Sequence, residues 1–128
     1  KPLFLGLQNE VLYVILMDNA SHPLFDLKAA EGVPNHVSID TRKLLRDVLR
    51  SNATSAILAH NHPTGPALPS KADQMTTLQI MQLLAPAGVS ILDHIIVAGD
   101  NACSMADRGR LPDLKDYPTF LSAASPHP

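Results

Sequence analysis

A fourteen-residue stretch, HNHPTGPALPSKAD at positions 60–73, constrains the fold of this chain more than any other part of the sequence. It follows the short aliphatic run AILA at positions 56–59, which predicts a buried strand bounded by turn residues. Side chains two apart in a strand point to the same side, so His60 and His62 can direct both imidazoles to one point. Asn61 then faces the other way. Proline and glycine residues after the second histidine exclude a helix or a central strand there, so the chain must loop.

A helix is expected to begin directly after this loop, with Ser70 as its N-cap and Asp73 in its first turn. The loop can therefore return the carboxylate of Asp73 to the imidazoles of His60 and His62. Two histidines and one carboxylate are a three-ligand set for catalytic zinc, with a fourth position left to water. The same Ser-x-x-Asp pattern is also an ordinary capping box, which satisfies free N–H groups at a helix start. The two roles are compatible, and we favour the metal site because a Pro/Gly loop joins both halves.

The composition is that of one small soluble domain, since the chain has 128 residues with 45% hydrophobic content. A net charge of -2 provides no general attraction to nucleic-acid phosphates. Cys103 is the only cysteine, which excludes a disulfide framework and a cysteine-rich zinc knuckle and favours a reducing compartment. No apolar run is long enough to span a bilayer, and no leader is visible. We therefore expect a cytoplasmic protein without a membrane partner.

Hydrophobic patterning predicts an α/β domain. Strands are expected at 10–18, 22–32, 54–59, 89–98 and 102–105, and helices at 41–51 and 70–84, after a lead-in segment at 1–8. This order indicates a mixed β-sheet flanked by helices, with His60 at the carboxyl end of a strand, where open α/β sheets bind ligands. We expect the domain to cover residues 1–115, with an irregular, proline-rich tail at 116–128.

The motif at the centre of the chain resembles that of a known family. The pattern His-x-His-x7-Ser-x2-Asp resembles the JAMM signature of MPN-domain metalloproteases; its positions here are His60, His62, Ser70 and Asp73. The string HNHPTG and the later DHII at 93–96 resemble the RadC branch, and the similarity covers roughly residues 5–111. The resemblance implies a cytidine-deaminase-like MPN/JAMM fold and a Zn²⁺ ion held by the two histidines and Asp73. It also implies hydrolysis of peptide or isopeptide bonds, with a metal-bound water as the nucleophile.

The resemblance assigns two further roles. Glu10 opens the first strand and would be the general base, which takes a proton from water and passes it to the leaving amine. The hydroxyl of Ser70 would donate to the developing oxyanion. Glu31 is the other acidic candidate upstream of the histidines, so the choice of base stays open. Asp93 and His94 are interpreted as a buried, hydrogen-bonded structural pair rather than a fourth metal ligand, with support of the metal ligands as the alternative.

The rival interpretation is a non-catalytic protein- or DNA-interaction module associated with DNA repair. MPN domains that have lost their metal ligands act as scaffolds, whereas all the ligand positions of the motif are intact here. Aromatic residues make up only 4% of the chain and tryptophan is absent, so nucleic-acid binding is not expected for this fragment alone. A zinc deaminase would need a Pro-Cys-x-x-Cys motif, which a single cysteine cannot supply. The expected partner is a peptide or protein substrate; its identity and the oligomeric state are left open.

Overall fold

The computed structural model describes residues 9–32 and 39–116. The predicted lead-in at 1–8 and the predicted tail from residue 117 lie outside the described residues. The elements follow the order β1 (Glu10–Met17), β2 (Pro23–Gly32), α1 (Thr41–Leu49), β3 (Ser55–Asn61), α2 (Lys71–Leu84), η2 (Ala85–Ala87), β4 (Ser90–Ala98), β5 (Asn101–Ser104) and η3 (Leu114–Asp116). Every predicted strand and helix is present, with ends that differ by one or two residues.

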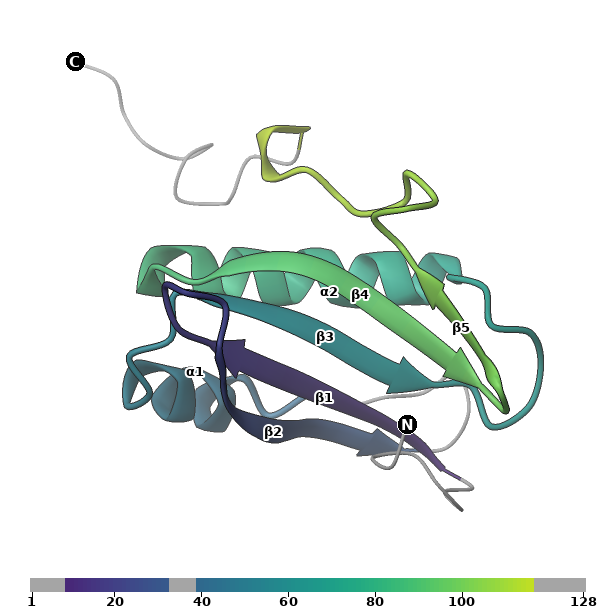
Figure 1. The fold of residues 1–128 in the computed structure, drawn as a ribbon, viewed down its shortest axis with the longest axis horizontal. Coiled ribbons are helices and arrows are strands. Elements are labelled where there is room, and N and C mark those ends of the chain that lie inside the picture. The colour runs from purple at the N-terminus through teal and green to yellow at the C-terminus, as the bar shows by residue number, and fades with distance from the viewer. Residues whose placement is uncertain (1–8, 33–38, 117–128) are drawn as a thin grey trace.

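The strands form one five-stranded sheet in the order β2-β1-β3-β4-β5 (Figure 1). The β3–β4 pair is parallel, and the other three pairs are antiparallel. A parallel pair needs a crossover connection, which here is made by α2. The prediction of an α/β domain with a mixed sheet is confirmed.

Both described helices lie on the same side of the sheet (Figure 1). The main core is formed between this face and the helices; it includes Leu12 and Leu58 from the strands, Val48 from α1 and Ile80 from α2. Strand β1 is buried or half-buried at every position, as its nearly continuous apolar sequence predicts. On the opposite face, a smaller cluster is built on Val11, Ala59 and Val97. Within the described residues, the helices therefore flank one face only.

The sheet register brings several strand ends to one edge. His60 at the end of β3 pairs with Leu12 near the start of the antiparallel β1, and with Ile96 on the parallel β4. Helix α2 begins at the same edge, where the hydroxyl of Ser70 accepts from the backbone N–H of Asp73 at 3.0 Å and the Asp73 carboxylate accepts from the N–H of Ser70 at 2.7 Å. The predicted capping box is therefore confirmed. Among the described residues, no helix is long and apolar enough to cross a membrane.

Candidate metal centre

Two imidazoles and two carboxylates converge at this edge of the sheet. Candidate ligand atoms of Glu10, His60 and His62 all lie within 4.8 Å of one another. Nε2 of His60 lies 2.8 Å from Oε1 of Glu10 and 3.4 Å from Oδ1 of Asp73. Nε2 of His62 lies 3.1 Å from Oδ2 of Asp73. The structure thus brings together the three predicted metal ligands and the predicted general base.

The strands and the helix explain this convergence. His60 lies in β3, and His62 directly follows the last residue of that strand. The backbone N–H of His62 still donates to the Val97 carbonyl at 2.7 Å, so the two histidines share one side, as predicted. Glu10 precedes Leu12 by two residues, so its side chain lies on the same face of the sheet as His60. Glu10, His60 and Asp73 are each no more than 6% exposed. Carboxylates removed from water require charged or hydrogen-bonding partners, and the imidazoles supply them.

Asn61 fixes the strand that carries Glu10. Its side-chain oxygen accepts from the backbone N–H of Val11 at 2.7 Å, and its side-chain nitrogen donates to the backbone carbonyl of Asn9 at 2.9 Å. These two bonds hold the backbone on both sides of Glu10. Asn61 therefore braces the start of β1.

The loop after β3 sets the tautomer of His62. Nδ1 of His62 lies 3.0 Å from the carbonyl oxygen of Pro66, which can only accept, so Nδ1 carries a proton. Nε2 is thereby directed at Asp73. The hydrogen bond to that carboxylate raises the pKa of His62; burial opposes the shift, and the Pro66 carbonyl reinforces it. A proton and a cation therefore compete for Nε2 of His62.

Asp73 stays ionised in this setting. Burial alone would raise its pKa, but the hydrogen bonds from His62 and from the backbone N–H of Ser70, together with the charge of His60, lower the pKa to about 2. Asp73 is therefore a carboxylate at neutral pH, as a metal ligand must be.

In the metal-free protein, we expect the free energy of unfolding to fall as the pH drops from about 4 to about 2. The pKa of Asp73 is about 2 in the folded state against an ordinary value of 3.8, so its stabilising contribution is present above the higher value and is lost as the pH falls through the lower one. The difference corresponds to about 2 kcal/mol. Urea unfolding of the wild type and of Asp73→Asn measures it, and equal pH dependence in both proteins would contradict it.

A cavity of about 310 Å³ adjoins the cluster. It is lined by Glu10, His62, Thr64, Pro66, Leu68, Pro69 and Ser70. Because the Ser70 hydroxyl accepts from the Asp73 N–H, its own proton can be donated to a group in the cavity. The structure therefore places Ser70 at the wall of a space that also borders Glu10 and His62.

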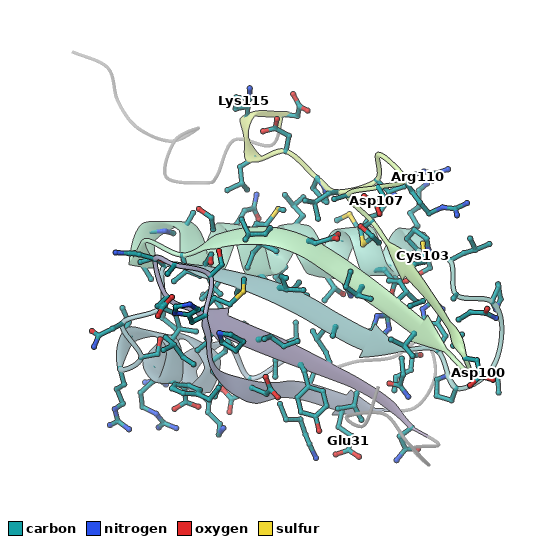
Figure 2. The ribbon with its side chains drawn as sticks, viewed as in Figure 1. Glu31, Asp100, Cys103, Asp107, Arg110 and Lys115 are labelled. Carbon is teal, nitrogen blue, oxygen red and sulfur yellow. The ribbon has the colours of Figure 1, made fainter. Side chains whose placement is uncertain are left out.

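Glu31, the alternative base, lies on the edge strand β2 (Figure 2). Its side chain is 45% exposed and forms an ion pair at 3.2 Å with Lys28. Glu31 is not part of the Glu10–His60–His62 group found among the described residues. The geometry therefore favours Glu10.

His94 and Thr77 extend the cluster into the core. Nε2 of His94 lies 3.2 Å from Nδ1 of His60, and Nδ1 of His94 lies 2.6 Å from the hydroxyl of Thr77. Burial and the neighbouring charge of His60 lower the pKa of His94 to about 3, so His94 is neutral. The carboxylate of Asp93 bonds instead to Ser104, to the N–H of Ala106 and to the backbone N–H of His94.

Asp93 and His94 are thus hydrogen-bonded to each other through the His94 backbone N–H. The His94 ring contacts His60 and Thr77 instead of Asp93, which agrees with the alternative in which His94 supports a metal ligand. Sequence reasoning missed Thr77 altogether. Its spacing of four residues from Asp73 on α2 is the signal that could have revealed it, because side chains at that spacing share one helix face.

Two comparisons relate the chain to known proteins. Residues 1–110 match the family model of the RadC-like JAB domain. The chain is also similar to a UPF0758 protein of Pseudoalteromonas translucida (strain TAC 125), with 39% identity over 104 residues. That match covers 81% of this chain and 46% of the relative, so the chain spans about half the length of that curated protein.

Proposed function

We propose that this chain, which belongs to the family of RadC-like JAB domains, is a zinc-dependent hydrolase of peptide or isopeptide bonds. The observation that carries the proposal is the convergence of two imidazole nitrogens and two carboxylates beside a cavity. Nitrogen and carboxylate ligands suit zinc, so the residues present fit this ion. When bound, zinc would supply Lewis acidity towards a scissile carbonyl and towards water at neutral pH.

The contacts favour His60, His62 and Asp73 as the ligands and Glu10 as the base. The Asp73 carboxylate lies close to Nε2 of both histidines, and the capping box holds it in place. Glu10 lines the cavity, whereas Asp73 is not among its lining residues. A general base must reach the reacting atoms, so the carboxylate at the cavity wall is the better candidate.

The chain's own groups can then perform the proton transfers. Glu10 would take a proton from the attacking water and deliver it to the leaving amine. The Ser70 hydroxyl would donate to the oxyanion that develops on the scissile carbonyl. Pro66, Leu68 and Pro69 give the cavity an apolar wall against which a substrate would pack.

Ser70→Ala is expected to slow hydrolysis about 100- to 1000-fold, because one oxyanion donor is lost. The same substitution removes the N-cap of α2, which costs about 1 kcal/mol of stability. Asp40→Ala is the matched control, since Asp40 caps α1 by accepting from the N–H of Lys43 at 3.1 Å. The control should lose similar stability but no activity. Equal rates for Ser70→Ala and Asp40→Ala would remove Ser70 from the chemistry.

The proposed function is tested by metal analysis and peptide cleavage. Protein purified without chelator, or reconstituted with zinc, should hold about one zinc per chain, as expected for a single catalytic site. It should cleave members of a peptide and isopeptide library, lose this activity in chelator and regain it with zinc. A protein that binds no zinc even when the ion is offered would overturn the proposal.

A further inference from the structure

A buried chain of hydrogen-bonding groups leads from the candidate metal centre into the core. It has four contacts: Glu10 Oε1 to His60 Nε2 at 2.8 Å, His60 Nδ1 to His94 Nε2 at 3.2 Å, His94 Nδ1 to Thr77 Oγ1 at 2.6 Å, and Thr77 Oγ1 to the Asp73 carbonyl at 2.6 Å. His60, His94 and Thr77 are 4%, 1% and 0% exposed. Because water does not reach these three side chains, their hydrogen-bond donors and acceptors must be paired with one another or with neighbouring protein groups.

The groups at both ends of this series of hydrogen bonds are acceptors. The Glu10 carboxylate, when ionised, and the Asp73 carbonyl carry no proton to donate. In the state that binds a metal, both imidazoles are neutral. The two imidazoles and the Thr77 hydroxyl then contribute three protons to four contacts. The sulfur of Met105 lies 3.8 Å from the Thr77 hydroxyl and is the weaker acceptor, so the carbonyl at 2.6 Å takes that proton. One of the four contacts in this series therefore lacks a proton.

The position of the missing proton depends on the tautomer of His60. If His60 carries its proton on Nε2, the deficit falls on one of the three inner contacts, all of which are buried. If the proton is on Nδ1, then His60 donates to His94, His94 donates to Thr77, and Thr77 donates to the Asp73 carbonyl. The deficit then lies at Nε2, facing Glu10, where a cation or a fourth proton can fill it.

We propose that Thr77 and His94 are positioning residues that hold His60 with its proton on Nδ1 and the lone pair of Nε2 directed into the metal centre. The inference rests on the proposed metal site. His62 needs no second residue to position its proton, because the Pro66 carbonyl fixes its tautomer directly. His60 has a second histidine as its partner, which can donate or accept. Thr77 removes this ambiguity, since its hydroxyl already donates to a backbone carbonyl and so must accept from His94.

Thr77→Val tests the proposal, because it keeps the shape of the side chain but removes the acceptor for His94. The His94 proton then has no partner at Nδ1 and is favoured at Nε2, where it opposes a proton on Nδ1 of His60. Competition with a chromophoric chelator should show that zinc affinity falls about 10- to 100-fold, the usual effect of losing a partner behind a metal-binding histidine. Thr77→Ser should restore the affinity, and Thr76→Val should leave it unchanged as the matched control on the same helix.

A second readout needs no variant. Nitrogen-15 spectra of the zinc-loaded wild type should show His94 protonated on Nδ1 and unprotonated on Nε2. Protonation on Nε2, or wild-type zinc affinity in Thr77→Val, would overturn the role of the two residues while leaving the metal site intact. A wild type that binds no zinc would overturn the proposed function itself, and the positioning role with it.

Discussion

Alanine at His60 or at Asp73 is expected to abolish metal retention. Each substitution leaves two of the three proposed ligands, and at Asp73 it also removes the carboxylate that approaches both imidazoles. Catalytic zinc takes three protein ligands and a water, so a site with two protein ligands should no longer retain the ion. Elemental analysis of protein purified without chelator measures the effect.

The controls separate ligand loss from general damage. His22→Ala removes a histidine that is 74% exposed and pairs only weakly with Asp18 at 3.6 Å, so zinc content should be unchanged. Asp73→Asn keeps the size of the side chain and an oxygen that can accept from Ser70, so the helix start should survive. Full metal occupancy in folded Asp73→Asn would remove Asp73 from the ligand set.

Much of the candidate site could be predicted because its residues are close in sequence. His60, His62, Ser70 and Asp73 lie on one strand end, one loop and one helix start, whose local rules are strong. The capping box follows from two residues three apart. The mixed sheet follows from the alternation of apolar strands with two helices. These conclusions need no information about distant pairing.

The parts that could not be predicted depend on distant pairing. The contact of His94 with His60 spans 34 positions and requires the parallel register of β3 and β4. The burial of Glu10, which is only 5% exposed although it begins a strand, follows from the antiparallel pairing of β1 with β3. Likewise, the four-residue spacing of Thr77 from Asp73 places both on one helix face, but the local sequence does not show that His94 lies against that face. The hydrophobic pattern of a strand shows which residues share a face of the sheet, but the register between strands decides which residues become neighbours.

Glu10→Gln is expected to keep the metal and lose hydrolysis. The amide has nearly the same shape as the carboxylate but cannot take a proton from water, and general base catalysis typically contributes about 100- to 10,000-fold in rate. Zinc content should match the wild type while kcat falls by that factor. Single-turnover assays with zinc-reconstituted protein, on any peptide that the wild type cleaves, measure the loss.

Glu31→Gln is the matched control, because it makes the same change at the other upstream glutamate, which is exposed and paired with Lys28. It should leave both zinc content and kcat unchanged. The carboxylate of Glu10 lies within 4.8 Å of candidate ligand atoms on both histidines, so the geometry also permits direct coordination by Glu10. The two roles predict different results. A Glu10→Gln protein that loses its zinc would make Glu10 a ligand, whereas one that holds zinc without turnover places Glu10 in the proton transfer, beside a metal held by His60, His62 and Asp73.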